Sequence, residues 1–88
     1  MRWSLEFTDV GRDDLKKLDH MVRRQVIDRL EWFSVHFEQT RPLPLHADWK
    51  GYFKLRVGDW RVAYIFDTSK QTIKVQRIEH RTKVYKRK

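Results

Sequence analysis

Several residue types that would point to a particular chemistry are scarce or absent from this chain of 88 residues. It has no cysteine, which excludes disulfide bonds and cysteine-ligated metal sites and favours a reducing compartment. Its three glycines are too few for a glycine-rich phosphate loop, and no G-x-S-x-G nucleophile motif occurs. No apolar run approaches the roughly 18 residues that span a bilayer, and the first residues do not resemble a signal peptide. We therefore expect a cytoplasmic protein that does not associate with a membrane.

Metal ligands are also poorly represented. The four histidines, His20, His36, His46 and His80, are widely separated, and no HxxxH, HExxH or acidic-cluster spacing occurs. A single histidine is more often a surface or packed residue than a ligand. We therefore expect a protein without a metal or another cofactor.

Charge is abundant but unevenly distributed along the sequence. The net charge is +8, yet residues 1–49 hold 8 basic and 9 acidic residues, whereas residues 50–88 hold 12 basic and 3 acidic ones. Such asymmetry favours a polyanionic partner, because cations that bind phosphates release condensed counterions. The alternative is a solvated basic surface that serves only solubility.

Hydrophobic periodicity predicts a single domain over residues 1–88 that begins with a strand and two helices. Alternation over 2–8 predicts the strand, with Trp3 facing the core. Thr8 and Asp9 supply N-cap chemistry for a short helix over 9–18, although Gly11 weakens it. A long amphipathic helix over 20–38 should complete a helical hairpin. Its apolar stripe consists of Val22, Val26, Leu30, Phe33 and Phe37.

Three further strands are predicted in the second half of the chain. Pro42 and Pro44 indicate a linker or an edge segment. Strands over 51–57 and 60–66 flank a two-residue turn, and a third strand over 72–80 changes parity at a probable bulge near Arg77. The order β-α-α-β-β-β predicts an α+β fold, with a helical hairpin on one face of an antiparallel sheet and a basic open face.

The predicted hairpin places several cations on its open face. Gly58-Asp59 at the turn pairs residue 57 with 60, 56 with 61 and 54 with 63, so that Lys54, Arg56 and Arg61 share one side. Like charges directly opposite each other destabilise a ladder. A guanidinium binds phosphate oxygens in a bidentate manner, so this pattern favours nucleic-acid binding. We expect Arg61 to lie on the open surface and to contribute nothing to the core.

Two segments, "KLRVGDWRVAY" and "IEHRTKVY", resemble the hallmark segments of the RelE/ParE superfamily of type II toxins. The opening strand and the helical hairpin with "DDLKKLD" are also similar, so the resemblance covers nearly the whole chain. It implies a RelE-like microbial RNase fold and a cognate antitoxin as partner. In the RelE branch it also implies cleavage of mRNA in the ribosomal A site, with contacts to ribosomal RNA. The ParE branch inhibits DNA gyrase instead.

The resemblance assigns roles to individual residues. The RelE-type catalytic set maps onto Lys54, Arg61, Arg81 and Tyr85. A second lysine of the RelE pattern is replaced by Tyr52, so the proton acceptor is left open. The residues expected to bind RNA are Lys50, Tyr52, Arg56, His80, Lys83 and Lys86, the last two in a basic tail over 83–88.

The implied reaction is a metal-independent cleavage that leaves a 2′,3′-cyclic phosphate and a 5′-hydroxyl. Arg61, with Lys54 and Arg56, would stabilise the charge on phosphorus. Arg81 would act on the leaving group or the scissile phosphate, and Tyr85 would stack on a base or accept a proton. Two alternatives use the same surface without this chemistry: a ParE-like gyrase inhibitor and a non-catalytic nucleic-acid-binding module.

Overall fold

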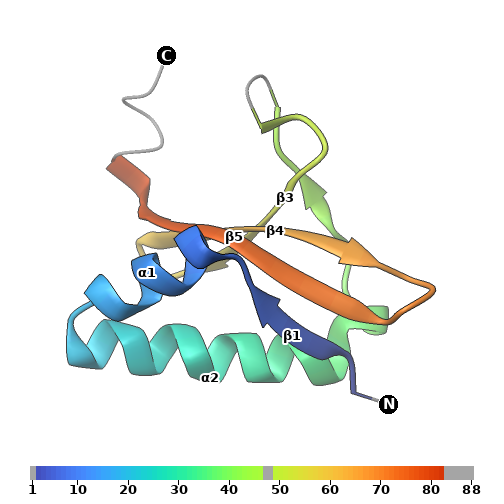
Figure 1. Ribbon diagram of the computed structural model, residues 1–88, viewed down its shortest axis with the longest axis horizontal. Helices are drawn as coiled ribbons and strands as arrows, with labels where there is room; N and C mark the ends of the chain where they lie inside the picture. Colours follow the sequence, from blue (N-terminus) through green and yellow to red (C-terminus); the bar gives the residue numbers. More distant parts are fainter. Residues whose placement is uncertain (1, 47–48, 83–88) are drawn as a thin grey trace.

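The structure is a computed structural model that describes residues 2–46 and 49–82. Two helices lie on one side of a twisted sheet (Figure 1). None of the described helices has the length and apolar character that crossing a bilayer requires. In chain order the elements are β1 (Ser4–Phe7), α1 (Asp9–Lys17), α2 (His20–His36), the 3-10 turn η1 (Phe37–Gln39), β2 (Leu43–Pro44), β3 (Phe53–Val57), β4 (Trp60–Asp67) and β5 (Thr72–His80).

The strands form one five-stranded sheet in the order β1-β5-β4-β3-β2. All neighbours are antiparallel except β1, which runs parallel to β5 with Ser4 opposite Thr72. The expected antiparallel sheet therefore contains one parallel pair. The proline-rich segment is an edge strand of two residues, as anticipated, and Pro44 offers no backbone donor for further pairing there.

The central hairpin has the predicted register. Arg56 lies opposite Arg61, and Lys54 lies opposite Ala63. Gly58 in the turn has φ 58°, a left-handed conformation that glycine adopts without a steric penalty. The cross-strand pair of arginines is therefore a feature of the folded protein.

The predicted irregularity in β5 is also present. Ala63 pairs with Arg77, whereas the next residue of β4 pairs with Val75, so Gln76 is an extra residue in the ladder. Both Val75 and Ile78 are consequently buried, although their positions differ in parity. The bulge also directs the side chain of Arg77 away from the core.

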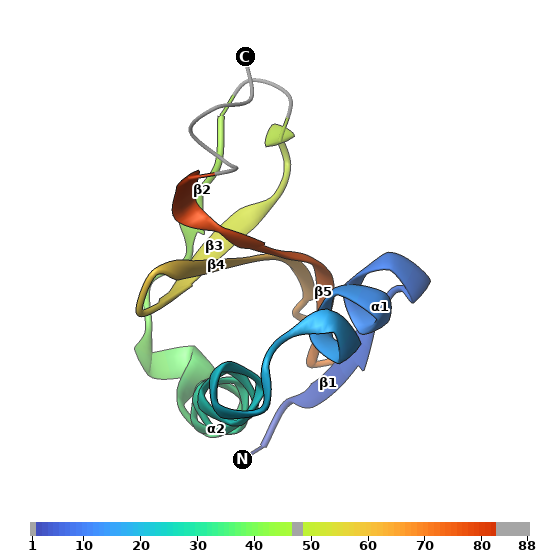
Figure 2. The same ribbon diagram turned by 90° about the vertical axis from the view of Figure 1, so that its left-hand side faces the viewer.

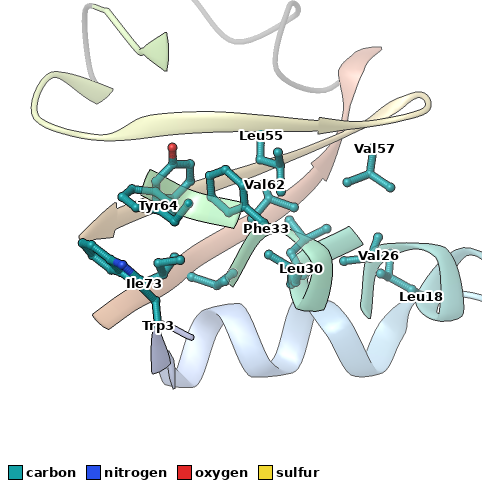
Figure 3. Packing of buried hydrophobic residues seen from close by; sticks show 13 residues of the cluster. Trp3, Leu18, Val26, Leu30, Phe33, Leu55, Val57, Val62, Tyr64 and Ile73 are labelled. Atoms are coloured by element: carbon teal, nitrogen blue, oxygen red, sulfur yellow. The ribbon is translucent and has the colours of Figure 1, made fainter. Parts of the chain in front are cut away.

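The hydrophobic core lies between α2 and the sheet. Phe33, Leu30 and Val26 of α2 point toward Leu55 and Val62 of the hairpin (Figure 3). The predicted stripe is thus the core-facing side of α2. The buried hydrophobic cluster comprises Trp3, Leu18, Val26, Leu30, Phe33, Phe37, Leu55, Val57, Val62, Tyr64, Ile73, Val75 and Ile78.

Helix α1 packs unusually close to β5. Its N-cap Thr8 accepts a hydrogen bond from the Gly11 backbone N–H at 3.0 Å, and the Thr8 N–H donates to the Val75 carbonyl at 3.0 Å. A Cβ at Gly11 would lie 2.5 Å from that carbonyl oxygen. Gly11 therefore permits a helix-to-strand approach that a larger residue would block, and the approach fixes α1 beside the strand that carries Arg77.

Candidate active site

The sheet face opposite the helices, here called the helix-free face, is partly covered. The described part of the β2–β3 connection lies on that side of the sheet (Figure 2). Leu45 and Trp49 from this connection line a cavity of only about 20 Å³ together with four residues of the sheet face. Those four residues are Arg61 and Ala63 of β4 and Arg77 and Glu79 of β5.

Arg56 and Arg61 occupy one rung of the ladder but differ sharply in exposure. Arg56 is exposed, whereas Arg61 is 9% exposed. The expectation that Arg61 lies on the open surface is therefore wrong. Its second cross-strand neighbour is Glu79, which is 6% exposed, and Trp49 helps to cover it. Among the described residues Arg56 has no second cross-strand neighbour, because β2 pairs with β3 only at residues 53 and 54.

Lys54 lies two residues from Arg56 on β3 and is half-buried. Its cross-strand neighbours are Ala63 and, on the other side, Leu43. It lines a groove of about 220 Å³ between the β2–β3 edge and α2, together with Arg41 and Arg29. The cations of the hairpin thus divide between this groove and the covered centre of the sheet.

His80 ends β5 and packs against an aromatic neighbour. It lies opposite Trp60, and the two rings meet edge to face with centroids 5.2 Å apart. The Thr82 backbone N–H donates to His80 Nδ1 at 3.3 Å, and the Thr82 hydroxyl lies 2.9 Å from the same nitrogen. The backbone bond requires Nδ1 to be an acceptor, which places the ring proton on Nε2 in the neutral imidazole.

Arg81 follows directly and is held at the β3–β4 turn. Its backbone N–H donates to the Asp59 carbonyl at 2.8 Å, and its Nη1 lies 4.0 Å from Asp59 Oδ1. The side chain is 51% exposed. Arg81 therefore lies just past the end of β5, two residues after Glu79, whose cross-strand neighbour is Arg61.

The remaining candidates lie in the β2–β3 connection or outside the described residues. Tyr52 meets Trp49 edge to face at 5.3 Å, and its carbonyl accepts from the Leu45 N–H at 2.9 Å. Tyr52 therefore helps to hold the cover over the sheet, while Lys50 is exposed. Three candidates lie outside the described residues: Lys83, Tyr85 and Lys86.

A partly buried ion pair that sequence reasoning missed joins α1 to the same sheet face. Arg77 Nε donates to Asp14 Oδ2 at 3.0 Å, and Arg77 Nη2 lies 3.6 Å from Glu79 Oε2. Asp14 Oδ2 also accepts from the Ile78 N–H at 2.9 Å, which satisfies a donor at the uncovered edge of β5. The sequence shows that Arg77 and Glu79, two residues apart on one strand, point to the same face. It does not show that Asp14, 63 residues before Arg77, contacts it.

The described part of the chain contains no group of three or more histidine, aspartate or glutamate residues placed to hold a metal ion. The helix-free face offers guanidinium groups instead, and the imidazole of His80 lies at the end of β5, at a position that alternates with Glu79 and packs against Trp60. Guanidinium groups stabilise negative charge on phosphate oxygens, and an imidazole transfers protons. This arrangement suits binding or metal-independent cleavage of a phosphodiester.

The family with the description "ParE toxin of type II toxin-antitoxin system, parDE" matches residues 5–85. The chain belongs to the RelE/ParE superfamily of type II toxins. This superfamily toxin is 30% identical over 91 residues to Toxin RelG of Mycobacterium tuberculosis, with 99% of the chain and 100% of the relative covered. The resemblance seen in the two hallmark segments is thereby confirmed.

Solved structures agree with this membership. The toxin of the RelBE2 toxin–antitoxin complex from Mycobacterium tuberculosis superposes with a TM-score of 0.79 at 27% identity, covering 92% of this toxin and 100% of that chain. A mutant of Escherichia coli RelE in the free state gives a TM-score of 0.72 at 21% identity, covering 98% and 93%. Both share the two helices on a five-stranded, mostly antiparallel sheet.

Proposed function

We propose that this toxin is a metal-independent endoribonuclease that cleaves mRNA in the ribosomal A site and thereby stops translation. The observation that carries the proposal is the position of Arg81, which is held to Asp59 just past the end of β5, two residues after Glu79, the cross-strand neighbour of Arg61. Similarity to proteins named RelE and RelG supports the nuclease branch of the superfamily.

In the proposed reaction the 2′-hydroxyl of the RNA attacks the adjacent phosphorus. A base takes the 2′ proton, the bond to the 5′ oxygen breaks, and that oxygen leaves with a proton. Arg61 would stabilise the added negative charge on the non-bridging oxygens, and Arg81 would act at the leaving group. A preorganised guanidinium shielded from water is more effective than a solvated one, so the burial of Arg61 is compatible with this role.

The proton acceptor is assigned to one of two residues, His80 or Tyr85. His80 could accept a proton only at Nδ1, because its Nε2 already carries one, and this requires release of the bond from the Thr82 N–H. Tyr85 is the other candidate, because the family resemblance places it in the catalytic set, where it would stack on a base or accept a proton. Tyr64 is unsuited, because burial raises its pKa and keeps the phenol protonated. Replacing His80 or Tyr85 separately by Phe would identify which one sets the pH dependence of cleavage.

The partners follow from the same proposal. A site with few acids and bases depends on accurate placement of the RNA, and positioning is worth ~7 to 11 kcal/mol in favourable cases. The ribosome would supply that placement, with ribosomal RNA contacting Lys50, Arg56 and the basic tail. Relatives solved as toxin–antitoxin complexes support a cognate antitoxin that neutralises this toxin.

The deciding experiment is single-turnover cleavage of mRNA on programmed ribosomes, with new 5′ ends mapped on transcripts. Arg81→Ala should lower the rate about 10² to 10³-fold, since it removes one charge from the transition state and nothing from the core. Lys70→Ala, which removes an exposed cation from the turn between β4 and β5, is the matched control and should cleave normally.

Two other outcomes would replace the proposal. Linear plasmid DNA in the presence of gyrase, without transcript cleavage, would assign the toxin to the gyrase-directed branch. RNA binding with neither kind of cleavage would identify a non-catalytic module.

A further inference from the structure

Four charged side chains of alternating sign extend from α1 across the helix-free face to β4. They are, in order, Asp14, Arg77, Glu79 and Arg61. The first three are joined by contacts of 3.0 Å, between Asp14 Oδ2 and Arg77 Nε, and 3.6 Å, between Arg77 Nη2 and Glu79 Oε2. Arg61 lies directly opposite Glu79 in the ladder, and both line the small cavity beneath Trp49.

The series is anchored at its Asp14 end. Asp14 is 9% exposed and accepts hydrogen bonds from Arg77 Nε at 3.0 Å, from Arg77 Nη2 at 3.4 Å and from the Ile78 backbone N–H at 2.9 Å. Two bonds from one guanidinium to one carboxylate fix the orientation of its plane. Arg77 Nη2 is thereby presented to Glu79 from a fixed position.

Burial makes the charges of Glu79 and Arg61 depend on each other. The residues Glu79 and Arg61 are 6% and 9% exposed, and side chains this deeply buried carry charge at low cost only when a counter-charge is close. Exposed pairs behave differently: in Arg24–Asp28 the side chains are 73% and 65% exposed, and such pairs are held only weakly.

We infer that Glu79 is a positioning residue that fixes the guanidinium of Arg61 on the helix-free face, with Arg77 and Asp14 holding Glu79 in place. The catalytic consequence rests on the proposed nuclease function. An RNA phosphate would meet a guanidinium whose orientation is already set, so less side-chain ordering is needed in the transition state.

The positioning is tested without RNA by the NMR signal of the Arg61 Nε–H group, assigned by its loss in Arg61→Lys. In Glu79→Gln this signal should shift and broaden, because the charged partner is gone. Glu6→Gln removes a carboxylate of β1 whose side chain is 52% exposed and lies 4.0 Å from the Lys74 ammonium. It is the matched control and should leave the Arg61 signal unchanged. An unchanged signal in folded Glu79→Gln would overturn the inference.

A second variant keeps the test decisive if Glu79→Gln does not fold. Arg77→Lys retains the charge, but a single ammonium group cannot reproduce the two bonds to Asp14 together with the contact to Glu79. The Arg61 signal should broaden in this variant too. A signal like that of the unmodified toxin would count against the role of Arg77.

Cleavage kinetics test the consequence. Glu79→Gln should lower the single-turnover rate at least tenfold while the half-saturating ribosome concentration changes less than twofold. In an Arg61→Lys background, the same substitution should lower the rate less than twofold further, because Glu79 acts through Arg61. Equal losses in the two backgrounds would overturn the inference. A toxin that cleaves no RNA but whose Arg61 signal responds to Glu79→Gln would disprove the nuclease proposal and leave the positioning intact.

Discussion

Arg56 and Arg61 face each other across one rung of the β3–β4 ladder, yet they occupy opposite environments. Arg56 extends into solvent at the poorly paired end of β3, where water screens its charge. Arg61 lies on β4, opposite Glu79 of β5, and lines the same small cavity as Trp49. The ladder accommodates two like charges on this rung because Glu79 balances the charge of Arg61, whereas water screens the charge of Arg56. Exposure, more than residue type, therefore distinguishes a surface cation from a site cation here.

The largest expected effect separates these two arginines directly. Arg61→Met should lower the free energy of unfolding by about 3 kcal/mol, because it removes one of the two counter-charges beside the buried Glu79. Arg56→Met should change it by less than about 0.5 kcal/mol. Urea unfolding of both variants measures the difference. Equal losses would show that the two positions are equivalent in solution and would remove the contrast.

The next effect concerns the anchored end of the charge series. Asp14→Ala should lower the free energy of unfolding by about 2 kcal/mol. It removes the ion pair between Asp14 and Arg77, and it leaves the Ile78 N–H without its acceptor. Urea unfolding is again the measurement, with Asp13→Ala, an exposed neighbour on α1, as control. Wild-type stability of Asp14→Ala would mean that the series contributes nothing to the fold.

A smaller effect is expected from the cover over Arg61. Trp49→Ala should lower the free energy of unfolding by about 1 kcal/mol, because the aromatic contact between the half-buried Trp49 and Tyr52 is lost. Water should then reach the covered face. Faster solvent exchange of the Arg61 Nε–H in this variant would confirm that Trp49 shields it. Exchange at the original rate would assign the shielding to other residues.

The smallest effect is expected for an ion pair that is exposed to solvent, as Arg56 is. Asp28→Ala breaks the 3.7 Å contact with Arg24 on α2, where both side chains are largely exposed. Unfolding free energy should change by less than about 0.5 kcal/mol. A loss comparable to that of Asp14→Ala would contradict the link between burial and strength.

Much of this fold was predictable from local patterns. Alternation and the Gly58-Asp59 turn gave the register of the hairpin, and the parity change at Ile78 located the bulge. The core stripe of α2 followed from its spacing. These features depend on neighbours within a few residues, which a sequence displays directly.

What could not be predicted depends on contacts between distant segments. No local pattern shows that β1 runs parallel to β5, or that Asp14 meets Arg77. The burial of Arg61 depends on two such contacts, with Glu79 on β5 and with the connection that carries Trp49. A residue can therefore be assigned to a face from sequence, while its exposure depends on what the rest of the chain places above that face.

The parallel pairing of β1 with β5 also sets an order of events during synthesis. Ser4 and its partner, Thr72, are separated by 67 residues, so the first strand is made long before its place in the sheet exists. Contacts so distant in sequence form late, because a large loop must close first. The nascent toxin thus lacks a completed sheet until β5 has been made, and the helix-free face becomes ordered only after that strand has joined β4 and β1.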